Sequence, residues 1–391
     1  MSPSASDEQG RHIVIVGGGV IGVCSAYYIT RLIPDAKVTL IEGTEIAAAA
    51  SGKSGGFLAL DWCDSGPLGK LARKSFALHA ELAAELDGPR HYDYRLLDTW
   101  QIEADFEDRE VVDGKATGRK GPKRAVKGAE AVPWLDTTRV LQTTVTGNHS
   151  STAQVTPAKF ARTVMKAAQA NGAKLVIGTV RGLRLENGRV HAVKVISDGR
   201  RRDISCTDVV LAMGPWSAQA KEWLPLPNLN MLDTRAHSVV LLPKEPVPAQ
   251  ALFVNMKVGT GYAEPEVYPR SDGTVYLCGE ADEVKLPPTA AQVEPADEAT
   301  QRLVRCAHLL SPTHLGNTKP IREQACFLPT LVDGRPAIGK LGPGASNVVM
   351  ATGHTCWGIL NSPATGLVVA ELLAGLEPSV GLSKFDTKRL L

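Results

Sequence analysis

This 391-residue sequence lacks the features that would indicate a nucleic-acid-binding, membrane-spanning, disulfide-rich or metal-binding protein. Its 43 basic residues nearly balance its 41 acidic residues, so neither nucleic acid nor an acidic membrane surface is an expected partner. No apolar stretch is long enough to predict a membrane span. The seven cysteines are widely spaced and include no C-x-x-C pair, which favours a reducing compartment over a disulfide framework. The histidines show no metal-ligand spacing, so no metal is expected.

The remaining composition is that of a soluble globular protein, with 43% hydrophobic and 21% charged residues. Its length allows one large domain or two to three ordinary ones. Residues 1–10 lack the basic start and apolar run of a signal peptide, so the expected location is the cytoplasm. The basic stretch at 115–127 is interpreted as a solvated surface loop, with an anion-binding patch as the alternative.

A strand–loop–helix–strand pattern near the N-terminus carries the strongest local signal. Residues 12–16 and 37–41 are β-branched runs typical of buried parallel strands, and 22–32 is typical of a helix between them. The connecting loop reads Gly17-Gly18-Gly19-Val20-Ile21-Gly22. Gly17 permits a tight turn, Gly19 lets the backbone approach a pyrophosphate, and Gly22 lets the helix pack close to the strand. The positive end of that helix then favours phosphates.

Glu42 extends this pattern to a dinucleotide site. It follows Gly22 by 20 residues and ends the second strand, where a carboxylate can accept both ribose hydroxyls. An acid at this position disfavours the 2′-phosphate of NADP, so NAD and FAD both remain open on this pattern alone.

Periodicity predicts the other elements. Helices are expected at 68–86, 156–171, 296–310 and 359–376. Strands are expected at 174–180, 182–186, 190–196, 208–212 and 347–351, with a strand-rich stretch at 233–280 and a hairpin turn at Asn187-Gly188.

Three further segments stand out besides the N-terminal unit. They are the small-residue loop Ala50-Ser51-Gly52-Lys53-Ser54-Gly55-Gly56, the strand and turn at 209–216, and the glycine-containing stretches 333–339, 348–354 and Gly358-Ile359. Together these segments resemble the D-amino-acid oxidase family of FAD-dependent oxidoreductases, which includes glycine oxidase and sarcosine oxidase. In that family the loop passes the phosphates toward the flavin ring, and the last stretch places backbone N–H groups beside the flavin pyrimidine. The resemblance therefore indicates FAD, rather than NAD, as the cofactor.

The resemblance also implies the architecture. An α/β fold is expected, with a Rossmann-type FAD-binding domain assembled from residues 1–90, 151–232 and 321–391. Residues 91–150 and 233–320 are expected to form an α+β substrate domain built on an antiparallel sheet. The implied FAD-binding residues are Gly17, Gly19, Val20, Ile21, Gly22, Glu42, Gly43, Ser51, Gly52, Lys53, Ser54, Gly55, Gly56, Val180, Ala212, Gly214, Trp216, Cys326, Gly353, Gly358, Ile359 and Leu360.

The chemistry implied by the resemblance is oxidation of the C–N bond of a small-molecule amine or amino acid. A neutral amine would pass hydride to the flavin, and the imine would hydrolyse. Oxygen or an electron carrier would reoxidise the cofactor, although the family's oxygen-activating lysine falls near Leu277 in this chain. Two alternatives remain open, an FAD-dependent 2-hydroxy-acid dehydrogenase and a flavin-bound assembly or scaffold protein without turnover.

The chain departs from the family at the substrate side. Leu328 and Cys356 stand where glycine oxidase-like members have carboxylate-binding arginines, unless Lys53, Arg270 or Arg322 substitutes. No catalytic residue is firmly implied. The substrate-pocket candidates are Lys53, Glu266, Tyr268, His354, Cys356 and Trp357.

Several positions near the expected flavin ring have two interpretations. Glu266 could bind a cationic amine, but an edge carboxylate in solvent is favoured. His354 could touch substrate, but the family pattern favours a role in shaping the flavin loop. Cys326 occupies the position where sarcosine oxidase-like members attach FAD covalently, and the favoured alternative is a buried structural cysteine. Trp62, Trp216 and Trp357 either wall the pocket or fill the core beside it.

Overall fold

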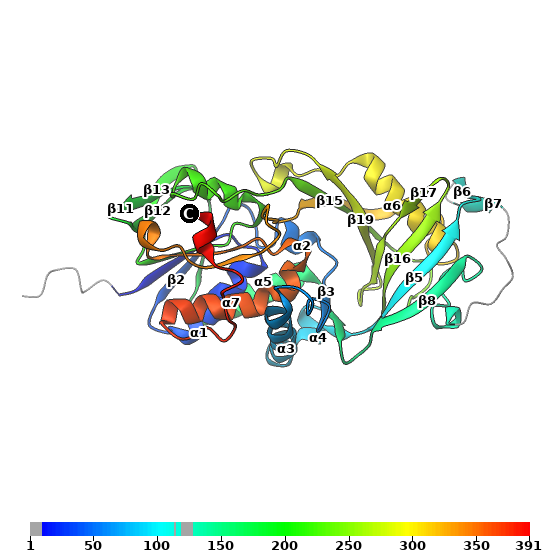
Figure 1. Ribbon diagram of the computed structural model, residues 1–391, viewed down its shortest axis with the longest axis horizontal. Helices are drawn as coiled ribbons and strands as arrows, with labels where there is room; N and C mark the ends of the chain where they lie inside the picture. The colour runs from blue at the N-terminus through cyan, green and yellow to red at the C-terminus, as the bar shows by residue number, and fades with distance from the viewer. Residues whose placement is uncertain (1–9, 113–114, 119–127) are drawn as a thin grey trace, which may run out of the picture.

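The computed structural model describes residues 10–112, 115–118 and 128–391. Residues 119–127 of the basic stretch interpreted as a surface loop lie outside these ranges. Two large sheets dominate the molecule and lie toward opposite ends of its long axis (Figure 1).

The first sheet has six strands in the order β10-β2-β1-β14-β22-β21. Five strands run parallel, and only β21 is antiparallel to its neighbour. The strands are β1 (His12–Val16), β2 (Lys37–Glu42), β10 (Lys174–Ile177), β14 (Asp208–Leu211), β21 (Ala337–Lys340) and β22 (Val348–Thr352). The parallel pairing of β1 with β2 confirms the predicted βαβ unit.

Helices cover one face of this sheet, some packed on its strands and others on neighbouring helices. The helices are α1 (Val20–Leu32), α3 (Gly69–Glu85), α5 (Pro157–Ala170) and α7 (Gly358–Ala374). α7 packs against α1 and α3, and α1 also packs against α5 (Figure 1). The expected helices at 68–86, 156–171 and 359–376 are thereby confirmed to within two residues at each end.

A three-stranded antiparallel sheet covers the other face. It consists of β11 (Thr179–Glu186), β12 (Arg189–Ser197) and β13 (Arg200–Ser205). Asn187 and Gly188 join β11 to β12 with φ of 51° and 71°, which confirms the predicted hairpin turn.

The prediction of a single strand at 174–180 is wrong. The chain leaves the parallel sheet at Gly178 and joins the antiparallel one, and one apolar run contributes to both.

The second large sheet has eight strands, with β17 (Gly261–Ala263) pairing only with β16. In spatial order the others are β20 (Pro320–Phe327), β15 (Thr234–Leu241), β19 (Val275–Glu283), β18 (Glu266–Pro269), β16 (Gln250–Val258), β5 (Asp98–Phe106) and β8 (Val140–Gly147). Adjacent strands are antiparallel except β5 and β16, which are parallel. Helix α6 (Asp297–Leu310) packs on one face through Leu303 and Ala307, and Leu277 lies in the same core.

The predicted start of the last FAD-domain segment at residue 321 is wrong. β20 forms a ladder with β15 that reaches Phe327, so this stretch belongs to the substrate sheet. The chain rejoins the parallel sheet only at β21. The error arose because a strand's partner depends on long-range pairing, which periodicity does not report.

Short elements connect the two sheets. They are α2 (Ala50–Lys53), β3 (Phe57–Ala59), α4 (Gly88–His91), β4 (Arg95–Leu96), β9 (Thr152–Gln154) and the hairpin β6 (Arg109–Val112) with β7 (Lys115–Gly118). β9 pairs with both β3 and β4, so segments from both predicted domains meet in one small sheet.

Within the described ranges, one helical stretch, Thr355–Ala374, is long and apolar enough to cross a membrane. This finding corrects the expectation that no apolar stretch reaches that length. Within the fold, 72% of its apolar window is buried, and α1 and α3 pack against it. Its apolar composition is therefore accounted for by its place in the protein core.

Candidate functional site

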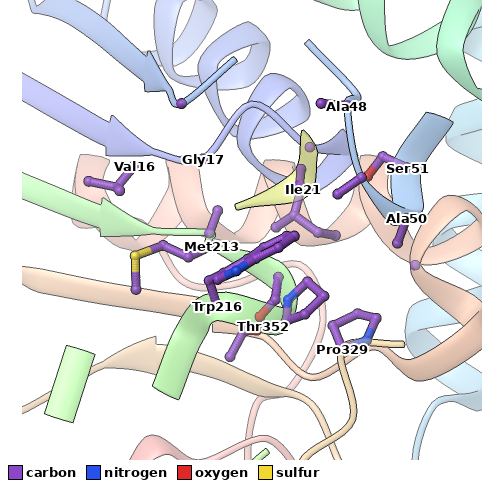
Figure 2. Close-up of a pocket in the computed structure, with 18 of the residues that line it drawn as sticks. Val16, Gly17, Ile21, Ala48, Ala50, Ser51, Met213, Trp216, Pro329 and Thr352 are labelled. Atoms are coloured by element: carbon purple, nitrogen blue, oxygen red, sulfur yellow. Dashed lines mark hydrogen bonds between the residues drawn. The ribbon is translucent and has the colours of Figure 1, made fainter. Parts of the chain in front are cut away.

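The site is a cavity between the parallel sheet and the substrate sheet. Its walls come from the glycine loop, the ends of β2, β14 and β22, the loop at 48–54, and residues 326–329 (Figure 2). Of the predicted cofactor residues, the structure brings together at this cavity Gly17, Gly19, Val20, Ile21, Glu42, Gly43, Ser51, Ser54, Val180, Ala212, Gly214, Trp216, Cys326, Gly353, Gly358 and Ile359. The predicted cofactor residues placed outside the lining are Gly22, Gly52, Lys53, Gly55, Gly56 and Leu360.

The glycine loop forms the middle of the cavity because it brings bare backbone to the start of α1. Gly17 has φ of +110°, and a Cβ there would lie 2.3 Å from the carbonyl oxygen of Ala212. Gly19 precedes the helix and supplies no capping side chain. The N–H of Val20 instead donates to Ser51 Oγ over 3.0 Å. The positive end of α1 therefore faces the cavity and can bind an anion.

Glu42 closes one end of the cavity. Its Oε2 accepts a 2.7 Å hydrogen bond from Gly18 N–H, and its Oε1 accepts one of 3.0 Å from Thr44 N–H. These bonds fix the carboxylate at the carboxyl end of β2, beside the loop that would hold a pyrophosphate. A ribose next to that pyrophosphate would present its hydroxyls to the same carboxylate.

The opposite end is built on the turn before α7. Gly353 and Thr355 both adopt left-handed backbone, with φ of 86° and 52°. The turn leads into the helix start at Gly358, which lines the cavity. Positive potential at this helix start would stabilise negative charge on a group bound beside it.

Neutral side chains fill the space between the two ends. Figure 2 shows the Trp216 ring in the middle of the labelled lining residues, with Met213 and Ile21 on one side and Thr352 and Pro329 on the other. Trp216 Nε1–H donates to the carbonyl of Pro287 over 2.8 Å, which ties the ring to a loop of the substrate domain. Such a polar-ended, apolar-centred cleft fits an elongated dinucleotide with a flat ring.

Comparison with known proteins identifies the class. The family model for FAD-dependent oxidoreductases matches residues 12–372. The chain belongs to the FAD-dependent oxidoreductase family. Two yeast relatives, both named only as candidate oxidoreductases, support this assignment. A Schizosaccharomyces pombe protein is 33% identical over 96% of this chain and 97% of its own length, and TDA3 of Saccharomyces cerevisiae is 30% identical over 99% and 96%.

A solved structure shows the same fold. Glycine oxidase from Geobacillus kaustophilus superimposes with a TM-score of 0.76 at 21% identity, covering 97% of this chain and 100% of that one. The α/β architecture expected from the sequence is thereby confirmed. FAD is the cofactor of this FAD-dependent oxidoreductase, and the cavity fits it from the ribose carboxylate to the helix start beside the ring.

Some lining residues of the FAD-dependent oxidoreductase were missed by sequence reasoning. Pro288, Thr289 and Ala290 reach the cavity from a loop of the substrate domain, and Gln219 and Trp223 reach it from the segment after β14. None of these residues sits in a glycine-rich or charged motif, so no local signal marked them. Their contribution depends on how the two sheets are placed.

The substrate-side candidates do not all face the cavity. His354 and Cys356 line it, whereas Trp357 packs against the core around α1. Lys53 Nζ donates to the carbonyl of Ala325 over 2.9 Å, and burial lowers the pKa of this ammonium. Trp62 packs on Phe57 and Phe253 at the substrate sheet, 5.0 and 4.7 Å between ring centroids.

Glu266 and Tyr268 share one face of β18, as alternation predicts, and Tyr268 Oη–H donates to Glu266 Oε2 over 2.6 Å. The favoured interpretation of Glu266 as an edge carboxylate is wrong. β18 lies inside the sheet between β19 and β16, and Glu266 is half-buried there. Strand order could not be read from the sequence, and strand order decides which residues lie at an edge.

His354 has a structural partner inside the fold. Its Nε2 lies 3.0 Å from Thr365 Oγ1 on α7, and the ring is 1% exposed. Burial lowers the pKa of His354 from 6.5 to about 4, so the imidazole is neutral at pH 7. This contact ties the turn before α7 to the helix itself.

This buried histidine predicts an acid-labile contribution to stability. The folded-state pKa lies below the unfolded one, so as the pH falls the unfolded chain binds the proton first. The stabilisation is fully present above about pH 6.5 and is lost toward pH 4, with about 2 kcal/mol lost by pH 5. We expect the free energy of urea unfolding to fall less between pH 7 and 5 in His354→Gln than in the wild type, by about that amount.

The control for this experiment is His149→Gln, because the His149 side chain is 66% exposed. It should show the wild-type decline with pH. Equal declines in the His354→Gln protein and the wild type would contradict the assignment of a depressed pKa to His354.

Proposed function

We propose that this FAD-dependent oxidoreductase oxidises the C–N bond of an amine by hydride transfer to the flavin, with oxygen or an electron carrier as the final acceptor. The observation that carries the proposal is the neutral, largely apolar wall around the ring end of the cavity, made by residues such as Trp216, Pro329 and Ile359. A dry wall favours transfer of hydride and keeps water from the reacting atoms until the imine is released.

The names of similar structures point the same way. Glycine oxidase of Geobacillus kaustophilus, L-proline dehydrogenase of P. horikoshii and an iminodiacetate oxidase of Chelativorans all share the fold, with TM-scores of 0.76, 0.76 and 0.72. Each name contains a nitrogen compound as the substrate. FAD supplies the hydride acceptor, and the protein supplies orientation and exclusion of water.

The test is anaerobic bleaching of the bound flavin. The FAD-loaded protein would be mixed with panels of primary and secondary amines, amino acids and 2-hydroxy acids, and the flavin absorbance followed. Bleaching by an amine or amino acid is the expected result. Bleaching by 2-hydroxy acids alone would overturn the proposal in favour of alcohol oxidation. No bleaching by any compound, from a flavin that dithionite still reduces, would favour a protein without turnover.

Cys326 permits a separate prediction about how FAD is held. Its thiol lines the cavity, and burial raises its pKa to about 11, a rise that the nearby Lys53 ammonium only partly offsets. A covalent bond to the flavin requires the thiolate, which is scarce at pH 7 under that pKa. We therefore propose that FAD is bound non-covalently.

Acid precipitation checks this prediction directly. The yellow colour should stay in the supernatant after the protein is precipitated with trichloroacetic acid, and the mass of the protein should equal that of the polypeptide alone. A yellow pellet that turns colourless only in Cys326→Ser would contradict non-covalent binding.

A further inference from the structure

The cavity lacks a cation where a substrate carboxylate would need one. Among the described residues that line it, Glu42 at the ribose end is the only Asp, Glu, Lys or Arg. Lys53 directs its ammonium at the carbonyl of Ala325. Arg270 places its guanidinium over the Tyr276 ring, 4.9 Å from the centroid, and donates to the carbonyl of Ser54 over 3.3 Å. Neither Lys53 nor Arg270 is a lining residue, and the Lys53 ammonium is held at the backbone next to Cys326.

A carboxylate stands beside the cavity instead. Glu266 projects from the middle of the substrate sheet, and the ladder places it opposite Phe253 on one side and Cys278 on the other. Tyr268 Oη–H and Cys278 Sγ–H both donate to its Oε2, over 2.6 and 3.5 Å. Within the described part of the chain, Oε1 receives no donor and is available to a ligand.

The position of Glu266 relative to the cavity follows from its neighbours. The ladders pair Glu266 with Cys278 and Cys278 with Ser238. Ser238 in turn pairs with Gln324, so these side chains share one face of the substrate sheet. Cys326 lies two residues from Gln324 on the same strand, and it lines the cavity. Glu266 therefore lies on the sheet face that borders the cavity.

Aromatic rings border the same carboxylate. Phe57, Trp62, Phe253 and Tyr268 form a continuous aromatic wall, with ring centroids 4.7 to 5.9 Å apart. Phe57, Trp62 and Phe253 are only half-buried, so they keep accessible surface. Aromatic faces beside one carboxylate favour an alkylated ammonium group, which gains both cation–π attraction and apolar contact.

We propose that the substrate is an alkylated amine without a carboxylate, and that Glu266 binds its ammonium against this aromatic wall. The inference rests on the proposed oxidation of a C–N bond. Glu266 would accept one proton from the ammonium and leave the nitrogen with its lone pair. FAD would supply the acceptor for the hydride on the carbon next to nitrogen, and the C–N bond would become an iminium. Water adds to the iminium, and a carbonyl compound, an amine and a proton are released.

The first test measures binding without turnover. Tetramethylammonium carries the charge and alkyl groups but has no nitrogen lone pair, so it cannot give up a hydride. Isothermal titration of the FAD-loaded protein should show saturable binding of tetramethylammonium and no binding of propionate. Glu266→Gln should weaken binding about tenfold or more, because a charge-assisted contact is lost.

Glu264→Gln is the matched control, since Glu264 is exposed and two residues away on the same segment. It should bind tetramethylammonium as the wild type does. Equal affinity in the wild type and Glu266→Gln, with FAD content retained in both, would overturn the assignment. So would binding of propionate without binding of tetramethylammonium.

The second test compares two substrates that differ only in a carboxylate. N-methylbutylamine should bleach the flavin at least about tenfold faster than N-methylnorvaline, and Glu266→Gln should remove most of that preference. Faster bleaching by N-methylnorvaline would overturn the substrate class while leaving C–N oxidation standing. Bleaching by no amine would overturn C–N oxidation itself, and this inference with it.

Discussion

Gly17→Ala is expected to yield protein that carries almost no FAD. Gly17 has φ of +110°, which an alanine adopts only under strain of about 1 to 3 kcal/mol. The added Cβ would also stand 2.3 Å from the carbonyl oxygen of Ala212, and neither backbone can move without shifting β1 against β14. The loop would have to open and carry the start of α1 away from the pyrophosphate. We expect FAD affinity to fall about 100-fold or more.

Gly43→Ala is the control for that substitution. Gly43 also lines the cavity, but a Cβ there meets no atom within 4 Å and its backbone needs no left-handed conformation. The ratio of the 450 nm flavin absorbance to the protein absorbance after gel filtration measures the outcome. Equal flavin content in the Gly17→Ala and Gly43→Ala proteins would show that the tight turn is not required for binding.

Glu42→Ala should have the second largest effect. The carboxylate accepts hydrogen bonds from Gly18 N–H and Thr44 N–H, and it faces the expected position of the ribose. Each hydrogen bond to a charged group is worth about 1.5 to 3 kcal/mol, so losing two ribose contacts predicts an affinity loss of at least about 100-fold. Measurement of the FAD dissociation constant by quenching of flavin fluorescence would check it.

Glu45→Ala separates this effect from a general loss of negative charge. Glu45 lies three residues further along and forms an exposed ion pair with Arg162, with Glu45 Oε2 3.0 Å from Arg162 Nη2. Exposed pairs contribute little, so FAD affinity should stay within about twofold of the wild type. A loss in Glu45→Ala as large as that in Glu42→Ala would mean that local charge, rather than ribose contact, accounts for the effect.

The nucleotide end of the site was predictable because its determinants are local in the chain. A buried β-branched run, a glycine loop and an acid at the end of the next strand lie within residues 12–42. The structure places β1, α1 and β2 there and pairs the two strands in parallel. Short-range periodicity and backbone sterics decide these features, so the sequence by itself determined the FAD-binding unit.

The substrate end depended on contacts between distant segments. Glu266 and Tyr268 were expected to share a face, but the interior position of β18 arises from its ladders with β16 and β19. Lys53 was expected in the pocket, and its bond to Ala325 on β20 holds it outside the lining. The domain boundary near residue 321 failed for the same reason, because β20 takes β15 as its partner.

Local sequence features thus determine that the chain binds FAD. Only the tertiary structure decides which side chains face the flavin. Alternation along a strand places a side chain on one of two faces, but it does not name the neighbouring strand. The pairings of β18, β19, β15 and β20 place Glu266 on the sheet face that carries Cys326 at the cavity. That long-range arrangement sets a carboxylate beside aromatic rings at the border of a cavity whose described lining contains no Lys or Arg, and it carries the substrate proposal.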